Sequence, residues 1–92
     1  MRESKVEGRL TTGVKKLGGK AYKWVSPNNS GVPDRIVILP GGRIIFVETK
    51  APGGRARALQ VEVHKFLRKL ECDVRVIDTV EKVDEFLREV SI

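Results

Sequence analysis

Apolar residues recur along this chain with two periods, and the alternation between the periods predicts its secondary structure. Helical spacing, with apolar residues three or four positions apart, is found in three segments: residues 3–17, 59–70 and 80–90. Shorter apolar or alternating runs, typical of strands, are found in four segments: residues 20–26, 34–39, 43–50 and 73–78. The pattern therefore predicts an α/β fold with the element order α-β-β-β-α-β-α.

The connections between the predicted strands indicate how the strands pair. Pro40-Gly41-Gly42 separates the second and third strands and is typical of a hairpin, so these two strands are expected to be antiparallel. The helix after the third strand is long enough to return the chain for a parallel pairing with the fourth strand. We therefore expect a mixed sheet flanked by helices.

The predicted helices differ in how strongly their sequences support them. Gly8 and Gly13 lower the helix propensity of the first helix. Asp78, with Glu81 three residues later, resembles a capping box at the start of the last helix. An apolar stripe runs along the middle helix and consists of Leu59, Val63, Phe66, Leu67 and Leu70.

The stretch "VPDRIVILPGGRIIFVETK" places three charged residues at one end of an apolar hairpin. If the loop has three residues, Leu39 faces Arg43, and the same register brings Asp34 opposite Glu48, with Cβ atoms about 5 Å apart. Lys50, two positions beyond Glu48, then lies on the same face. A loop of two residues would instead place Asp34 and Glu48 on opposite faces.

Two carboxylates at this separation repel each other unless a cation lies between them. Oxygen ligands suit magnesium or manganese, so Asp34 and Glu48 are candidate metal ligands, and the backbone carbonyl of Thr49 is a candidate third ligand. Lys50 would be close enough to orient a water molecule or to stabilise charge on a phosphate. The alternative is an ordinary salt bridge between Glu48 and Lys50, with Asp34 as a turn former.

Composition and charge narrow the class of protein. The chain has 92 residues, of which 40% are hydrophobic, and we expect a single small domain over residues 1–92. Its net charge of +6 and pI near 9.8 favour an anionic partner such as DNA or RNA, although a basic protein without such a partner is the alternative. The single cysteine, Cys72, excludes an internal disulfide framework. Without a signal peptide or membrane-spanning run, we expect a cytoplasmic protein with no membrane partner.

The residues of the hairpin also carry a family resemblance. "GVPD" followed by "ETK" resembles the Asp…Glu-X-Lys signature of the PD-(D/E)XK nucleases. The longer stretch "GVPDRIVILPGGRIIFVETKAPGGRARALQ" is similar to the virus-type replication-repair nuclease (VRR-NUC) domain. The resemblance implies a restriction-endonuclease-like core and hydrolysis of phosphodiester bonds with Mg²⁺ or Mn²⁺, leaving a 5′ phosphate.

The resemblance assigns roles to two further residues. Glu7 matches a first-helix carboxylate that supports the metal, directly or through water; Glu3 is the competing candidate, and a surface glutamate is the alternative for either. Gln60 matches a glutamine that orients water or phosphate. We therefore predict Glu7, Asp34, Glu48, Lys50 and Gln60 as the catalytic residues.

Several other residues are candidates for contacts with nucleic acid. Arg55 and Arg57 lie in the loop after the catalytic strand and are candidate phosphate clamps; a solvated loop is the alternative. Lysines near the first helix and strand are candidates for backbone contacts, or are solubilising: Lys15, Lys16, Lys20 and Lys23. Tyr22 and Trp24 can stack on bases or pack in the core. His64, one turn after Gln60, is more often structural than catalytic.

The substrate follows only from the resemblance. Stand-alone members of the family resemble Holliday-junction resolvases, so we expect a homodimer that cuts branched DNA. The exposed faces of an edge strand and of the last helix are the candidate dimer surfaces. A flap-type or nicking nuclease is one alternative, and a non-catalytic basic DNA-binding module is another.

Overall fold

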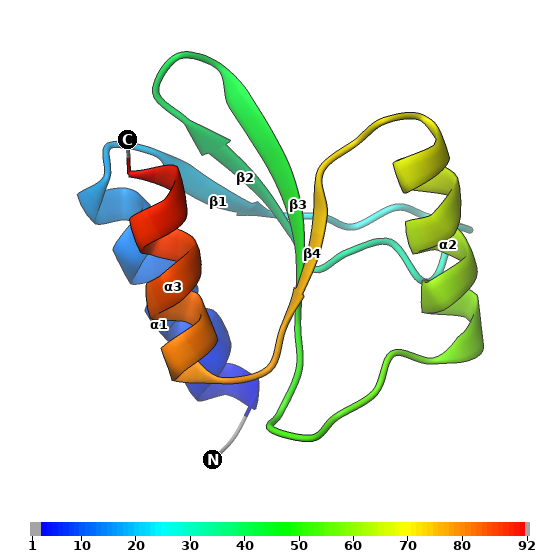
Figure 1. The fold of residues 1–92 in the computed structure, drawn as a ribbon. Helices are drawn as coiled ribbons and strands as arrows, with labels where there is room; N and C mark the ends of the chain where they lie inside the picture. The colour runs from blue at the N-terminus through cyan, green and yellow to red at the C-terminus, as the bar shows by residue number, and fades with distance from the viewer. Residues whose placement is uncertain (1–2, 92) are drawn as a thin grey trace.

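The computed structural model describes residues 3–91 and has the predicted element order (Figure 1). Its elements are α1 (Glu3–Lys16), β1 (Lys20–Lys23), β2 (Arg35–Leu39), β3 (Arg43–Thr49), α2 (Ala58–Lys69), β4 (Val74–Ile77) and α3 (Val80–Val90). The strands form one sheet in the order β1-β2-β3-β4; the first two pairings are antiparallel and β3 pairs with β4 in parallel. Within residues 3–91, no helix combines the length and apolarity needed to cross a bilayer.

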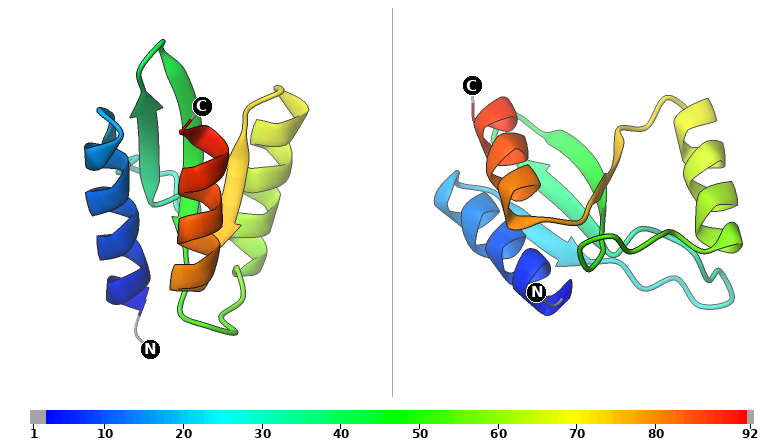
Figure 2. Two further views of the ribbon diagram at one scale, coloured as in Figure 1. Left: turned by 60° about the vertical axis from the view of Figure 1, so that its left-hand side comes forward. Right: turned by 60° about the horizontal axis from the view of Figure 1, so that its bottom comes forward.

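The helices cover the two faces of the sheet unequally. α1 and α3 lie side by side against one face, whereas α2 lies alone on the other (Figures 1 and 2). The hydrophobic core lies between the sheet and the α1/α3 pair. It includes buried residues from α1, the sheet and α3: Val6, Leu10, Val14, Val37, Ile45, Val47, Val83 and Phe86.

Gly13 allows α1 and α3 to approach closely. A Cβ atom at Gly13 would contact the side chain of Leu87 on α3, whereas a Cβ atom at Gly8 would meet open space. Arg9 and Asp84 join the same two helices by a two-pronged ion pair at 2.9 Å. One of the two glycines that lower the helix propensity of α1 therefore lies at a close contact between the two helices.

The hairpin has the predicted three-residue loop. Leu39 pairs with Arg43, and the register continues to the pair of Arg35 and Val47. Both glycines of the loop have positive φ, 89° at Gly41 and 80° at Gly42, a backbone region that other residues rarely adopt. The expected register, on which the juxtaposition of the charged residues depends, is confirmed.

The cap of α3 differs from the prediction. Thr79, not Asp78, is the N-cap, and its hydroxyl accepts the backbone N–H of Lys82 at 3.1 Å. Asp78 instead accepts a hydrogen bond from the side chain of Lys82 at 2.8 Å. Threonine is a favoured N-cap residue, and α3 therefore begins one residue later than a capping box starting at Asp78 would predict.

The apolar stripe of α2 is largely outside the core. Leu59, Phe66 and Leu70 are 54%, 61% and 58% exposed. The one buried residue of this helix is polar, His64. The helical period indicates which face is apolar but not what that face packs against, and here the sheet-facing side of α2 is partly polar.

Candidate active site

The charged end of the hairpin lies where β2 begins and β3 ends. Asp34 directly precedes β2, and its carboxylate accepts two hydrogen bonds from Thr49, one from the backbone N–H and one from the hydroxyl, both at 3.0 Å. Thr49 is fully buried. These two bonds fix the orientation of Asp34 beside the end of β3, next to Glu48.

Glu48 is buried, with 1% of its surface exposed. Its Oε2 atom accepts a hydrogen bond from Gln60 Nε2 at 3.2 Å and lies 3.3 Å from Lys50 Nζ. Its Oε1 atom has no hydrogen-bond partner among the described residues and lies 3.9 Å from Nε2 of His64. Oε2 of this carboxylate is therefore hydrogen-bonded, whereas Oε1 has no such bond among the described residues.

The surroundings of Glu48 disfavour its negative charge. Burial and, to a smaller extent, the neighbouring charge of Asp34 together raise the pKa of Glu48 to about 7, because Lys50 opposes these two effects only in part. Two carboxylates share one ammonium group in a site shielded from water. The site is therefore short of positive charge.

The chemistry of the donor groups fits a hard divalent cation. Two carboxylates beside a backbone carbonyl, with water to complete the coordination, is a combination that magnesium commonly uses. Within residues 3–91, His, Cys, Asp and Glu side chains nowhere gather in groups of three or more that would enclose a metal by themselves. Such a cation would lower the pKa of Glu48 and stabilise the ionised pair of carboxylates.

Gln60 connects α2 to this cluster. Its carbonyl oxygen accepts hydrogen bonds from Lys50 Nζ and from the backbone N–H of Arg57, the N-cap residue, each at 2.9 Å. Its amide nitrogen donates to Glu48. Gln60 therefore caps the start of α2 and orients the side chains of Glu48 and Lys50. The helix start, which lacks a hydroxyl cap, is stabilised in this way.

His64 lies one turn farther along α2 and is 2% exposed. Burial lowers the pKa of His64, and the positive charges of Arg68 and Lys50 lower it further. The imidazole is therefore neutral at pH 7. His64, which the sequence indicated only weakly as a site residue, therefore lies directly beside Glu48.

Glu7 is placed next to a different partner. Its carboxylate accepts a hydrogen bond from Arg35 Nε at 3.1 Å, and the same guanidinium donates to the carbonyl of Ala21. Arg35 follows Asp34 in the chain, so Glu7 is near the site but is held by the arginine. Glu3 is exposed. The metal-supporting role of Glu7 stays a prediction.

The predicted nucleic-acid-binding residues divide into two groups. Arg55 and Arg57 are exposed in the loop that leaves the site, and Lys23 pairs with Arg35 at the same end of the sheet. The others lie toward the opposite end of the sheet. Lys20 pairs with Ile38. Lys15 and Lys16 lie in the last turn of α1, about 12 Å along the helix from Glu7. Their contacts with DNA stay predictions.

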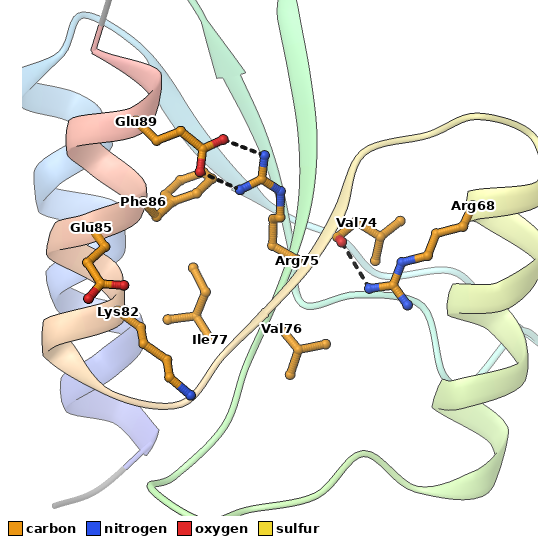
Figure 3. A pocket seen from close by; sticks show the side chains of 9 residues that line it. All are labelled: Arg68, Val74, Arg75, Val76, Ile77, Lys82, Glu85, Phe86 and Glu89. Carbon is orange, nitrogen blue, oxygen red and sulfur yellow. Dashed lines mark hydrogen bonds and ion pairs between the residues drawn. The ribbon is translucent and has the colours of Figure 1, made fainter.

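A separate hollow lies over β4, between α3 and α2 (Figure 3). Most of its charged side chains are bonded to the protein itself: Arg75 pairs with Asp73 and Glu89, and Arg68 donates to the carbonyl of Val74. These groups stabilise the edge of the sheet. Glu85 also lines the hollow but is exposed to solvent, so the hollow contains no buried carboxylate comparable to Glu48.

Two residues of the site were not identified from the sequence as side chains with a role. Thr49 was considered only for its carbonyl, yet its hydroxyl and amide hold Asp34. Arg35 was not considered, yet it binds Glu7. The signal for Thr49 was its position directly between Glu48 and Lys50, where a hydroxyl in a buried strand end needs a polar partner.

Comparisons with known proteins agree with this geometry. No family model matches the chain. A solved structure described as a VRR_NUC domain is similar over 96% of each chain, with a TM-score of 0.89 and 31% sequence identity. A protein named "Putative nuclease p44", from Acyrthosiphon pisum secondary endosymbiont phage 1, is 49% identical over 79 residues, which span 86% of this chain and 85% of that protein. The chain therefore belongs to the virus-type replication-repair nuclease (VRR-NUC) family of the PD-(D/E)XK nucleases.

Proposed function

We propose that this protein is a magnesium- or manganese-dependent DNA endonuclease. The observation that carries the proposal is the buried carboxylate of Glu48, with a pKa of about 7, beside Asp34 and Lys50. The nuclease family and the basic net charge of +6 support DNA as the substrate. Asp34, Glu48 and the carbonyl of Thr49 would hold the cation, with Glu7 in support through water.

The side chains around the cation divide the remaining work. When bound, the ion supplies Lewis-acid charge to the phosphate and to the attacking water. Lys50 has three N–H donors. One is directed to Gln60 and a second is close to Glu48 Oε2, so the third is available to a water or a phosphate oxygen. Gln60 keeps Lys50 and Glu48 in place. The water displaces the 3′ oxygen in line and leaves a 5′ phosphate.

The proposed substrate is branched DNA, such as a Holliday junction, cut by a homodimer. A two-fold dimer presents two identical sites to a substrate with two-fold symmetry. A surface suited to self-association is present on the α2 side of the molecule. We call it the outer apolar face and define it by five exposed residues: Tyr22, Ile38, Ile44, Phe66 and Leu70.

The strand members of the outer apolar face lie close together on the sheet. Ile38 pairs with Ile44 in the hairpin, and Tyr22 of β1 pairs with Ile36, two positions before Ile38 on β2. Trp24 stacks on Phe46 with ring centroids 4.9 Å apart and lines a hollow with Phe66. Side chains of this size, each about half exposed, present on the order of 500 Å², a large part of the roughly 800 Å² per partner in a standard interface.

The last helix is not part of this surface. Val83, Phe86 and Val90 of α3 are buried against the core, so these apolar side chains are not available to a partner, and the expectation that the exposed face of α3 provides a dimer surface stays a prediction. An edge strand does contribute, through Tyr22 of β1, which is 48% exposed. The middle helix supplies the larger apolar side chains because its stripe is left uncovered by the sheet.

Cleavage assays distinguish the proposal from its alternatives. A labelled four-way junction, a splayed-arm DNA and a linear duplex would each be incubated with Mg²⁺, Mn²⁺ or EDTA. We expect paired, cation-dependent cuts confined to the junction. Cuts mainly in splayed-arm or linear DNA would instead indicate a flap-type or nicking nuclease.

Asp34→Asn is the matched control for these assays. It should abolish cleavage while preserving or strengthening DNA binding, because it removes a negative charge next to the phosphate. Cleavage by this variant at the wild-type rate would show that the assigned site is wrong. If the wild type cuts no substrate and binds DNA equally in EDTA, the protein is a non-catalytic DNA-binding module.

A further inference from the structure

We propose that His64 is a positioning residue for Glu48: its neutral imidazole donates the Nε2–H to Glu48 Oε1 and fixes the carboxylate for the cation. The inference rests on the proposed function, because it assigns a further residue to the same site. Neither the predicted catalytic set nor the signature of the hairpin includes His64.

The starting observation is a matched pair of buried polar atoms. Glu48 Oε1 and His64 Nε2 are the two buried side-chain atoms without a hydrogen-bond partner among the described residues. They lie 3.9 Å apart, and their residues are 1% and 2% exposed. A buried donor and a buried acceptor left unpaired are each destabilising, so two that face each other are expected to pair.

A small approach of the two atoms would form a hydrogen bond that completes the set around Glu48. An N–H···O bond is about 2.9 Å long, so an approach of about 1 Å closes the gap. Gln60 already holds Oε2 at 3.2 Å and lies one turn before His64 on the same helix. One face of α2 would then hold both oxygens of the carboxylate. Oε1, with His64 as its one donor, keeps a lone pair for the cation.

The charge state of the ring is compatible with this role. Burial lowers the pKa of His64, so the ring at pH 7 carries one N–H, which the proposal places on Nε2. Partners of metal-binding groups that orient the ligand commonly change metal affinity 10- to 100-fold when they are removed. His64 would act in this way on Glu48 without touching the substrate.

Two amide substitutions separate a positioning role from simple packing. The amide nitrogen of glutamine in His64→Gln can reach the place of Nε2, whereas the shorter asparagine in His64→Asn places its nitrogen near that of Nδ1. Manganese affinity, measured by electron paramagnetic resonance without DNA, should fall at least about tenfold in His64→Asn and stay close to wild type in His64→Gln. Equal affinities in wild type and His64→Asn would overturn the proposal.

A second measurement requires no metal. In EDTA, ¹⁵N NMR of the imidazole should show the tautomer protonated at Nε2, and Glu48→Ala should shift the Nε2 resonance. A ring protonated at Nδ1, or no shift in Glu48→Ala, would overturn the contact. If the NMR result holds but wild-type protein binds no manganese, the contact is supported and the proposed cation site fails instead.

Discussion

Glu48 is the residue whose surroundings most restrict the chemistry of the site. Its carboxylate is buried, one of its oxygens is bonded to Gln60, and the charge of Lys50 compensates only part of the combined charge of Glu48 and Asp34. Ionisation of such a group lowers the stability of the protein near neutral pH, and a bound cation would offset this loss. Both consequences can be measured.

Stability in EDTA should depend on pH through Glu48. Its pKa rises from 4.5 to about 7 on folding, so the stability linked to its protonated form is present below pH 4.5 and is lost as the pH rises through 7. Glu48→Gln removes this loss. Between pH 5 and pH 8, wild type should lose about 2 to 3 kcal/mol more than the variant.

Urea unfolding of both proteins at the two pH values tests this prediction. The titration of His64 is common to both proteins, so the difference between them isolates Glu48 to first order. Unfolding free energies that change with pH by the same amount in both proteins would contradict the assigned environment of Glu48.

Thr49 should contribute to stability and to activity through Asp34. Thr49→Val removes the hydroxyl that donates to Asp34 but keeps the backbone N–H and the shape of the side chain. We expect a loss of about 1 kcal/mol in unfolding free energy and a lower cleavage rate with unchanged DNA affinity. Thr49→Ser, which keeps the hydroxyl, is the control. A cleavage rate in Thr49→Val equal to that of wild type would show that Asp34 does not require this hydrogen bond.

At the residue scale, the sequence predicted the centre of the site but not its supports. Loop length and a strand period of two were sufficient to bring Asp34, Glu48 and Lys50 together. The hydroxyl of Thr49 and the burial of His64 depend on which side chains neighbouring elements bring near, and no local period encodes that information.

At the scale of single elements, α1 contains two glycines with different surroundings. Gly8→Ala should stabilise the protein by about 0.5 to 1 kcal/mol, because alanine favours the helix and its Cβ meets open space. Gly13→Ala should gain less or lose stability, because Leu87 must move. Thermal unfolding of the two variants provides the comparison, and equal gains would show that α3 does not need the close approach.

Helix ends and faces were predicted unevenly for a physical reason. The bounds of α1 and α3 follow from periodicity. The cap of α3, however, is Thr79, whose hydroxyl accepts the backbone N–H of Lys82, while Asp78 accepts from the side chain of Lys82. The stripe of α2 was visible in the sequence, but its exposure was not. Packing partners are a property of the assembled fold, not of one segment.

At the scale of the whole molecule, the outer apolar face is expected to hold two copies together. Phe66→Glu places a charge at its most exposed member, which is 61% accessible, and should convert a dimer into monomers. Val25→Glu is a matched control, because Val25 is 73% exposed but lies outside this face. Sedimentation velocity of both variants tests the prediction; a dimeric Phe66→Glu variant would place the interface elsewhere.

The way α2 is attached has a consequence for the energetics of the molecule. Its one buried side chain, His64, lies beside Glu48, and polar contacts of Gln60 with Glu48 and Lys50 help to anchor the helix. Local unfolding of residues 58–69 should therefore be frequent without a cation, and amide hydrogen exchange there should slow when magnesium is added. If exchange rates in α2 do not change with magnesium while α1 and α3 stay protected, this coupling is contradicted. If they do change as expected, hydrogen exchange in α2 reports whether the cation is bound.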